Sequence, residues 1–312
     1  MPLLQMRSTT VDVNGPIHVA QWGEGDDPVF VLVHGLAGSH ANWMRVGPRL
    51  AERGRVLALD FPGFGLSPVA GRRTDLAAQR QLLHRFLEKT TAAKVVLAGN
   101  SMGGLVALVE AGLHPERVAG LILVDSALPV PWGTWPEPLV AASFMAYTVP
   151  PLGRRLVRRA LDRTRVEDLV AGAFALCMVD PHRIPGDVRS AHVEIERVRQ
   201  SHREENGRAF ADAARSIVLA HLNWGPVNRL IGRITAPTLV VQGAEDRLVR
   251  ADAALRAGRR RPDWEVAILA DTGHMPMLEV PDRFLRVVAP WLDANSLAPT
   301  LEPAERSGLV AS

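Results

Sequence analysis

The stretch that decides the fold of this 312-residue chain is Val95-Val96-Leu97-Ala98-Gly99-Asn100-Ser101-Met102-Gly103-Gly104. Its apolar start predicts a short buried strand, and residues 105–113 continue as an apolar helix. A serine at so sharp a junction has strained backbone angles, so Gly99 and Gly103 must lack side chains to let the turn close. The turn pushes the Ser101 hydroxyl to the carboxyl edge of a sheet, beside a helix N-terminus. The alternative is a glycine-rich turn in which the serine only caps the helix, and the flanking strand and helix disfavour it.

Short apolar runs rich in β-branched residues recur on both sides of this stretch, most of them followed by a helical pattern. Such alternation is typical of the β-α units that build a parallel sheet. A tight hairpin turn is predicted at Asn14-Gly15. We therefore predict an α/β fold with a mostly parallel eight-stranded sheet flanked by helices. The strands are expected at residues 4–13, 17–22, 29–33, 56–59, 95–98, 121–124, 238–242 and 265–269.

The β-α rhythm breaks between residues 128 and 233, where helical patterns and proline-rich joints occur without a convincing strand. We predict one α/β core from residues 1–127 and 234–294, with residues 128–233 inserted as a helical cap. An amphipathic helix at residues 281–292 is expected to close the sheet. Residues 295–312 lack periodicity and are predicted to be a disordered tail.

Composition and charge exclude several classes of protein. Cys177 is the only cysteine, so an internal disulfide and a multi-cysteine metal site are excluded. The net charge of +3 is small and the arginines are spread along the chain, whereas nucleic-acid-binding proteins normally concentrate basic residues on one face. We therefore expect no nucleic-acid partner. The densest basic stretch, residues 154–165, has helical spacing and is interpreted as a solvated helix face, with contact to an anionic surface as the alternative.

From the sequence we expect neither a secretory signal nor a membrane span. Residues 1–14 lack the basic-then-apolar run of a secretory signal. The longest uncharged run, residues 138–153, is broken by Pro150 and Pro151 and is shorter than the roughly 20 apolar residues that a span requires. We expect a soluble, cytoplasmic protein without stable membrane insertion, and peripheral membrane contact stays open. The sequence predicts no oligomeric state.

A serine becomes a strong nucleophile only beside a base and a carboxylate, and both follow later strands. His274 ends the segment Asp271-Thr272-Gly273-His274 after the last predicted strand, and Asp246 follows the strand before it. The chain order Ser101, Asp246, His274 is the order expected when all three side chains stand on loops at one edge of the sheet. The other histidines are interpreted as surface or core residues.

The identity of the carboxylate has alternatives. Asp246 is favoured over Asp125, which ends another strand and whose alternative role is to cap the loop that leaves the sheet. Glu245 is adjacent to the favoured aspartate and is also able to face the histidine. Asp271 is interpreted as structural.

Two backbone amides are predicted to receive an oxyanion. The amide of Met102 stands at the helix start, and the amide of Leu36 lies in the glycine-containing turn after the strand at residues 29–33. His34 is interpreted as shaping this turn rather than as a base. The glycine-rich loop at residues 60–67 lacks the lysine and the spacing of a phosphate cradle, so we interpret it as a structural turn beside the site.

In these four places the chain resembles the α/β-hydrolase superfamily over residues 4–293: the His34-Gly35 turn, the loop at 60–67, the Ser101 turn and the Asp246/His274 pair. The resemblance implies the α/β-hydrolase fold and a serine nucleophile. Epoxide hydrolases and haloalkane dehalogenases carry aspartate where this chain has serine, and the former also use cap tyrosines. Their chemistry is therefore disfavoured.

Within the superfamily, two groups are similar to this chain. The turn at residues 99–104 resembles that of carbon-carbon hydrolases acting on aromatic ring-fission products, whose oxyanion turn is more glycine-rich than residues 35–38. The spacing from His34 to Trp43 instead resembles monoacylglycerol lipases and related carboxylesterases, which we favour. Residues 129–152 are aromatic and nearly uncharged, so they either wall an apolar acyl pocket or pack the cap onto the sheet.

The sequence thus predicts a hydrolase of carboxylic esters with hydrophobic acyl groups, acting through an acyl-enzyme on Ser101. No metal and no organic cofactor are expected. One alternative is a carbon-carbon hydrolase, lactonase or cofactor-free perhydrolase on the same three residues. Another is a ligand-binding receptor of the same fold with little turnover.

Overall fold

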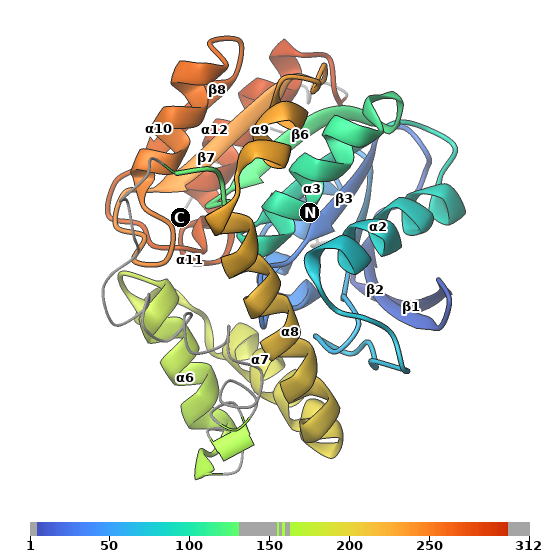
Figure 1. Ribbon diagram of the computed structural model, residues 1–312, viewed down its shortest axis with the longest axis vertical. Coiled ribbons are helices and arrows are strands. Elements are labelled where there is room, and N and C mark those ends of the chain that lie inside the picture. The colour runs from blue at the N-terminus through green and yellow to red at the C-terminus, as the bar shows by residue number, and fades with distance from the viewer. Residues whose placement is uncertain (1–4, 131–154, 156–157, 160–162, 299–312) are drawn as a thin grey trace.

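A computed structural model describes residues 5–130, 155, 158–159 and 163–298, and its described strands form one sheet (Figure 1). The sheet order is β1-β2-β4-β3-β5-β6-β7-β8. The β1–β2 and β2–β4 pairs are antiparallel and all other pairs are parallel. The predicted mostly parallel eight-stranded sheet is thereby confirmed. Its strands are β1 (Arg7–Asp12), β2 (Pro16–Trp22), β3 (Val29–Val33), β4 (Arg55–Leu59), β5 (Val95–Asn100), β6 (Val118–Val124), β7 (Thr238–Gly243) and β8 (Glu265–Leu269).

The hairpin between β1 and β2 turns at the residues that the sequence indicates. Asn14 has a φ of 52° and Gly15 a φ of 114°. Two successive residues of positive φ match the right-handed twist of the flanking strands, which explains the Asn-Gly pair. The strand register aligns Asp12 with Pro16 on either side of this turn.

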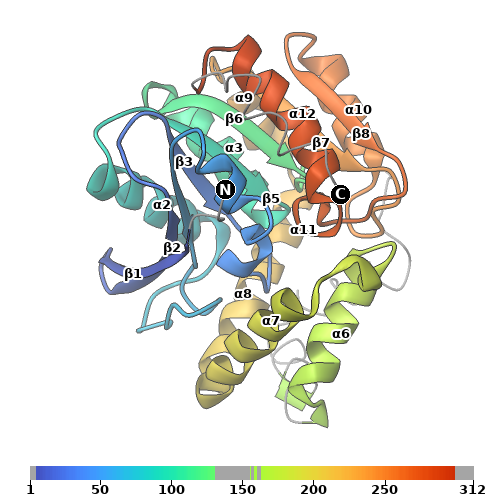
Figure 2. The ribbon, with the colours of Figure 1, turned by 180° about the vertical axis from the view of Figure 1, so that it is seen from behind.

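Helices cover both faces of the sheet (Figures 1 and 2). Val29, Val31 and Val33 of β3 pack in a core with α2, α3, α9 and α10, while Phe30 and Leu32 pack in a second core with α1 and α12. This alternation follows from the period of two along a strand, and it explains why the central strands are apolar throughout. The bounds are α1 (Gly47–Leu50), α2 (Leu76–Thr90), α3 (Met102–Leu113), α9 (Gly225–Ile231), α10 (Ala251–Arg260), α11 (Pro276–Glu279) and α12 (Pro281–Ala294), with short 3₁₀ turns η1 (His40–Trp43) and η2 (Pro115–Arg117).

The described residues between β6 and β7 form helices joined by turns and loops, without a strand. Three longer helices lie together at one end of the molecule (Figures 1 and 2): α6 (Val166–Cys177), α7 (Gly186–Arg199) and α8 (Arg203–Leu222). They are joined by the 3₁₀ turns η3 (Pro181–Arg183) and η4 (Gln200–His202). Helix α9 instead packs against α3, where Gly112 leaves room for Leu230. The division into a core and a separate cap at residues 128–233 stays a prediction.

Two predicted segments fall largely outside the described residues. Most of the aromatic stretch at residues 129–152 is among them, as are residues 299–312 of the predicted tail. The first residues of that tail are described, and Leu297 and Ala298 pack against the α12 side of the sheet. Leu297 occupies the space that a side chain at Gly120 would need.

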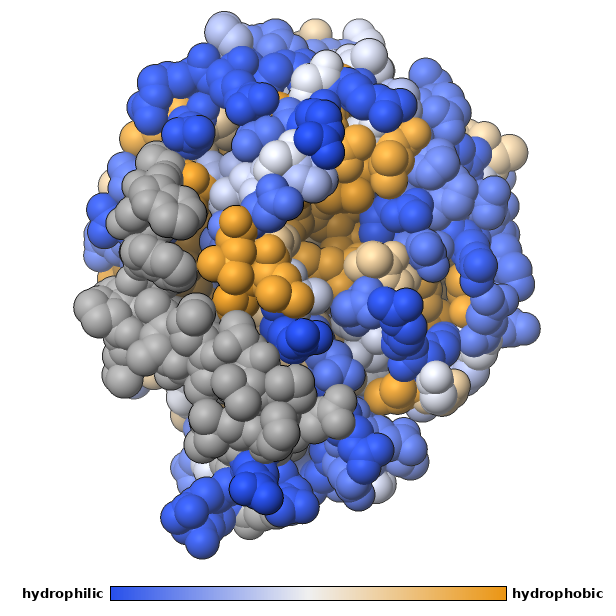
Figure 3. Space-filling view, viewed as in Figure 1, coloured by the Kyte–Doolittle hydropathy of each residue, from blue (hydrophilic) through white to orange (hydrophobic). Residues whose placement is uncertain are grey.

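The molecular surface is mostly hydrophilic on the face of Figure 1, with apolar side chains gathered near its centre (Figure 3). Leu219 and Leu222 at the end of α8 are 45% and 52% exposed. The arginines of the basic stretch that the structure describes are exposed, as a solvated helix face requires: Arg155, Arg158, Arg159, Arg163 and Arg165. Among the described residues, no helix combines the length and the apolar composition that crossing a membrane requires.

Candidate active site

Ser101 stands in a strained turn between β5 and α3. Its φ of 55° and ψ of −119° lie in a region that residues with a side chain rarely adopt. The backbone closes the turn, because the Ser101 amide donates to the Val124 carbonyl at 3.0 Å. A Cβ on Gly99 would lie 2.4 Å from the Gly103 carbonyl oxygen, and a Cβ on Gly103 would lie 2.4 Å from that of His34. Both glycines are therefore dictated by close backbone approach, as the sequence indicated.

Asp246 and His274 form a buried pair at the same edge of the sheet. Asp246 follows β7, His274 follows β8, and the His274 Nδ1–Asp246 Oδ2 distance is 2.6 Å. The other Asp246 oxygen accepts the amides of Leu248 at 2.7 Å and Val249 at 3.0 Å. Burial alone would raise the pKa of Asp246, but the charge and hydrogen bond of His274 and the Val249 amide lower it. An ionised Asp246 fixes the proton of the imidazole on Nδ1 and leaves Nε2 as a base.

Three segments meet around Ser101. Asn100 Nδ2 donates to the His274 carbonyl at 3.0 Å, which ties the serine turn to the histidine loop. A Cβ on Gly35 would lie 3.0 Å from Ser101 Cβ, so the turn after β3 lies directly against the serine. Among the described residues no hydrogen bond joins Ser101 Oγ to His274 Nε2, and such bonds are often long before substrate binds.

The turn after β3 is shaped by His34. The Gly38 amide donates to the Gly35 carbonyl at 3.1 Å, and Ala37 between them has a φ of 59°. His34 Nε2 accepts the Phe61 amide at 3.0 Å, and Nδ1 donates to the Gly35 carbonyl at 2.7 Å. Burial lowers the pKa of His34, so the ring is neutral and both nitrogens are engaged. His34 therefore has no free nitrogen with which to act as a base.

The loop at residues 60–67 wraps a carboxylate that is fully buried. Asp60 Oδ1 accepts the His40 amide at 2.6 Å, and Oδ2 accepts the Nδ1 atoms of His18 and His40, each at 2.9 Å. Burial by itself would raise the pKa of Asp60, but His40 and His18 hold it well below its ordinary range. A Cβ on Gly65 would lie 2.1 Å from the Asp60 carboxyl carbon, which explains a glycine there.

Asp60→Asn is expected to cost about 3–5 kcal/mol of unfolding free energy at pH 7, because it leaves buried donors facing a neutral amide. The pKa of Asp60 is lower in the folded than in the unfolded chain. The stabilisation of the fold by ionised Asp60 is therefore complete at a pH above the pKa of about 4 that the residue has in the unfolded chain. It is lost as the pH falls toward the lower pKa of the folded chain. Urea denaturation of the wild type and of Asp60→Asn, at pH 7 and at a series of lower pH values, measures the free energy of unfolding. The difference in this free energy between the two proteins is expected to shrink in acid. The exposed Asp252→Asn variant, which loses an ion pair with Arg250 and a negative charge in the first turn of α10, serves as the control.

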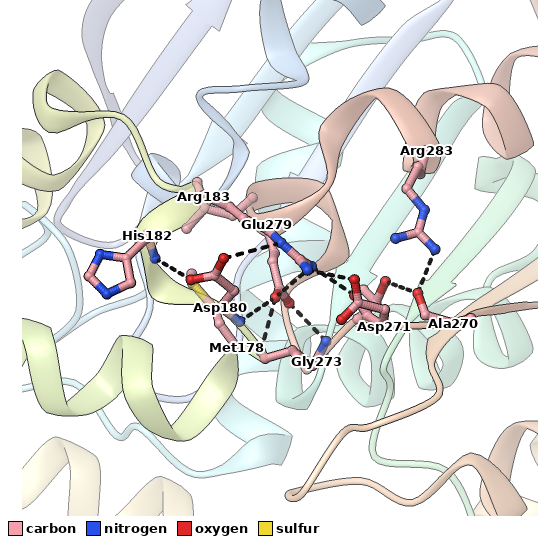
Figure 4. Close-up of polar contacts among 12 residues, drawn as sticks. Met178, Asp180, His182, Arg183, Ala270, Asp271, Gly273, Glu279 and Arg283 are labelled. Carbon is pink, nitrogen blue, oxygen red and sulfur yellow. Dashed lines mark hydrogen bonds and ion pairs between the residues drawn. The ribbon is translucent and has the colours of Figure 1, made fainter.

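A cluster of polar side chains connects the segment between α6 and α7 to the loop at residues 270–274, which carries His274 (Figure 4). The fully buried Glu279 accepts the amides of residues 179–180 through Oε1, at 2.9 Å each, and the Gly273 amide through Oε2 at 2.8 Å. Arg183 contacts Glu279 at 3.3 Å and Asp271 Oδ2 at 2.5 Å. Asp271 thus pairs with Arg183 rather than with the histidine. The sequence did not single out Glu279 or Arg183, because the contacts join segments far apart in the chain.

A cavity of about 260 Å³ lies between the turn after β3 and helices α6, α7 and α8. Residues 37–39 and Asn42 form one wall. His192 also lines it: Nδ1 donates to the Val188 carbonyl at 2.9 Å, while the buried Nε2 has no partner among the described residues. Burial lowers the pKa of His192, which favours the neutral ring with Nε2 as an acceptor. The apolar lining comprises Leu169, Val170, Ala173, Phe174, Ile195 and Phe210.

Three clusters of histidine and acidic side chains among the described residues have ligand atoms within 4.8 Å of one another, as a metal site requires. In each cluster a histidine Nδ1 is hydrogen-bonded to a carboxylate of the same cluster. At least one imidazole nitrogen and one carboxylate of each cluster are therefore already engaged with one another. The clusters are His18/His40/Asp60, His84/Glu110/His114 and Asp125/Asp246/His274.

The sheet order, the strained serine turn and the buried histidine-aspartate pair define a class of hydrolase, and the family comparison agrees. The model of the alpha/beta hydrolase family matches residues 30–287. The chain therefore belongs to the alpha/beta hydrolase family. The matched range includes Ser101, Asp246 and His274.

Relatives within this family have diverse activities. The chain is 32% identical over 261 residues to the dihydrolipoyllysine-residue acetyltransferase component of the acetoin cleaving system of Pseudomonas putida, covering 84% of this chain but only 62% of that protein. It is 27% identical to a 2-hydroxy-6-oxononadienedioate/2-hydroxy-6-oxononatrienedioate hydrolase of a Pseudomonas species, over 91% of this chain and 94% of the relative. Bacterial lipases are also relatives. A solved structure of a membrane phospholipase A is 26% identical, with a TM-score of 0.72 over 93% of this chain and 87% of the other.

Proposed function

We propose that this hydrolase cleaves carboxylic esters of hydrophobic acyl groups, with Ser101 as nucleophile, His274 as base and Asp246 as the carboxylate that orients it. The observation that carries the proposal is the 2.6 Å Asp246–His274 hydrogen bond, buried beside the strained serine turn. Relatives that are lipases and a structural neighbour that is a phospholipase support an ester as substrate.

The proposed mechanism depends on the position of the His274 proton, which lies on Nδ1 and leaves Nε2 free to accept another. His274 Nε2 takes the Ser101 proton as Oγ attacks the ester carbonyl, while ionised Asp246 stabilises the imidazolium. The amides of Leu36 and Met102 are proposed to receive the oxyanion, since one lies in the turn that packs against the serine and the other begins α3. The imidazolium then protonates the leaving alcohol. Water, deprotonated by the same ring, releases the acid from the acyl-enzyme.

The cavity beside the turn after β3 is the proposed site for the acyl group. The apolar part of its lining, which α6 contributes most, and its volume of about 260 Å³ suit a chain of moderate length, while Glu196, Arg199 and Asn206 make another part polar. Profiling p-nitrophenyl esters of increasing chain length tests this, and an optimum at intermediate length is expected. No turnover of any ester in the series would overturn the proposed substrate class.

Ala173→Phe is expected to narrow the cavity, because Ala173 lines it from α6. Esters of intermediate length should lose about tenfold or more in kcat/KM, while acetate esters retain most of theirs. Ala171→Phe places the same side chain on an exposed position of α6 outside the cavity lining and is the control. An equal loss for acetate and longer esters would contradict the placement of the acyl group.

Carbon-carbon bond hydrolysis is the second candidate, because a 2-hydroxy-6-oxononadienedioate hydrolase is 27% identical over nearly the whole chain. The same serine, base and oxyanion amides would serve it. A ring-fission analogue assayed beside the esters separates the two, since the preferred bond will show the higher kcat/KM. Stoichiometric binding of these compounds without release of product would instead indicate a receptor.

A further inference from the structure

Asp125 places a second carboxyl group against the Asp246–His274 pair. It follows β6 with a φ of 42°, and it is fully buried. Its Oδ1 accepts the Gln242 amide Nε2 at 2.7 Å and the Gly243 backbone amide at 2.8 Å. Its Oδ2 is also buried and accepts no hydrogen bond from the described residues. Within this part of the chain, one oxygen of Asp125 is thus held by two donors while the other has none.

The Asp125 side chain lies next to that of Asp246. Gln242 Nε2 reaches both carboxyl groups, at 2.7 Å to Asp125 Oδ1 and 3.3 Å to Asp246 Oδ2. The two side chains are within hydrogen-bonding reach of one another. Two carboxylates in contact without water repel each other strongly, and a single shared proton removes that repulsion.

The hydrogen-bond donors decide which carboxyl group takes the proton. Asp246 accepts two backbone amides and the His274 Nδ1 proton, all of which favour its ionised form. Asp125 has one backbone amide and a neutral side-chain amide, and burial and Asp246 raise its pKa well above the ordinary range. The proton therefore belongs on Asp125.

We propose that Asp125 is a neutral carboxylic acid whose Oδ2–H donates a hydrogen bond to the Asp246 carboxylate and so positions it for His274. The inference rests on the proposed function, because it assigns Asp246 as the carboxylate of a catalytic triad. Asp125 is a positioning residue: it contacts no reacting atom, and its proton stays in place throughout turnover. It fixes the rotamer of Asp246 and delocalises the negative charge that faces the imidazolium.

The other titratable groups around this pair do not favour a second negative charge. Glu279 lies close enough to raise the pKa of Asp125 further, and its own partner is Arg183. The Cys177 thiol borders the pair on the α6 side, and its pKa is raised to about 12 by burial and by the charge of Asp246. The imidazolium that His274 forms when it takes a proton contacts Asp246 rather than Asp125. Arg247 follows Asp246 in the chain, and its guanidinium donates to the carbonyls of Ala175 and Met178.

Asp125→Asn and Asp125→Leu separate this role from a purely structural one. An asparagine keeps an acceptor toward Gln242 and Gly243 and presents its NH₂ where Oδ2–H stood, so it is expected to retain most of kcat/KM. Leucine has similar bulk but no donor, and kcat is expected to fall about 10- to 100-fold with little change in KM. At alkaline pH the asparagine variant should hold its activity where the wild type declines, because it has no acidic proton to lose. A loss in Asp125→Asn as large as in Asp125→Leu would overturn the proposal.

Infrared difference spectroscopy detects the proton on Asp125 independently of any measurement of enzyme activity. The wild type at neutral pH should show the C=O stretch of a protonated carboxylic acid that Asp125→Asn removes, whereas Asp60→Asn, which replaces another buried but ionised carboxylate, should leave it in place. A spectrum without that band would refute a neutral Asp125 even if Asp125→Leu does not fold. A band that is present in a protein that cleaves no ester would instead count against the proposed function alone.

Discussion

Ser101→Ala is expected to reduce kcat for ester hydrolysis by about a millionfold, because no other group can form the acyl-enzyme. Covalent labelling by a fluorophosphonate, which reacts only with an activated serine, should disappear completely. The fold should survive, since the backbone of the turn is held by the Ser101 amide and by glycines rather than by the hydroxyl. The Ser101 side chain also makes no capping hydrogen bond to α3 that alanine would remove.

Ser126→Ala is the matched control for that result. Ser126 is buried beside the same turn, and its hydroxyl donates to backbone carbonyls, those of Gly99 at 3.3 Å and Val124 at 3.5 Å, rather than to a histidine. This variant should still be labelled at the wild-type rate. Mass spectrometry of the labelled protein locates the modified peptide. Labelling that persists in Ser101→Ala would reassign the nucleophile and refute the proposed mechanism.

The elements that the sequence predicted are those whose causes are local. The strand at residues 29–33 is buried on both faces and ends in a glycine turn, and the structure has β3 over the same residues. Gly99 and Gly103 are required by contacts of the serine turn with itself and with its neighbour strand. The placement of candidate residues at strand ends followed from parallel topology, which brings all carboxyl ends of the strands to one edge.

The polar clusters around the site could not be predicted, because they depend on pairings between distant segments. His18 reaches Asp60 only because β2 pairs antiparallel with β4 in a register that aligns Val19 with Leu59. Arg183 reaches Asp271 across 88 positions of the chain. An isolated histidine or arginine has no local pattern that indicates such a partner.

The lining of the cavity could not be predicted for a different reason. The sequence predicted that residues 129–152 either wall an acyl pocket or pack the cap onto the sheet, because they are aromatic and nearly uncharged. Most of them lie outside the described residues. The described cavity is lined by α6, α7 and α8, whose apolar residues alternate with arginine and glutamate. That pattern is typical of a helix with one solvated face, and only the packing shows that the other face borders a cavity.

Asp246→Asn is expected to lower kcat by about 10⁴-fold while leaving the fold intact. An asparagine facing His274 Nδ1 can present its NH₂ group, which favours the imidazole tautomer with its proton on Nε2. That tautomer cannot accept the Ser101 proton, and no negative charge remains to stabilise the imidazolium. The rate of fluorophosphonate labelling should fall in parallel with kcat, because both reactions need the same base.

Asp125→Asn is the comparison that makes this result decisive, since both substitutions remove a buried carboxyl group from the same cluster. His274 Nδ1 is hydrogen-bonded to Asp246 at 2.6 Å, whereas Asp125 is held by Gln242 and Gly243. Only the first substitution changes the tautomer of the histidine, so only Asp246→Asn should lose most of its activity. If Asp125→Asn were the more damaging change, Asp125 would be the ionised partner of the histidine. The proton would then lie on Asp246, in spite of the two backbone amides that its carboxylate accepts.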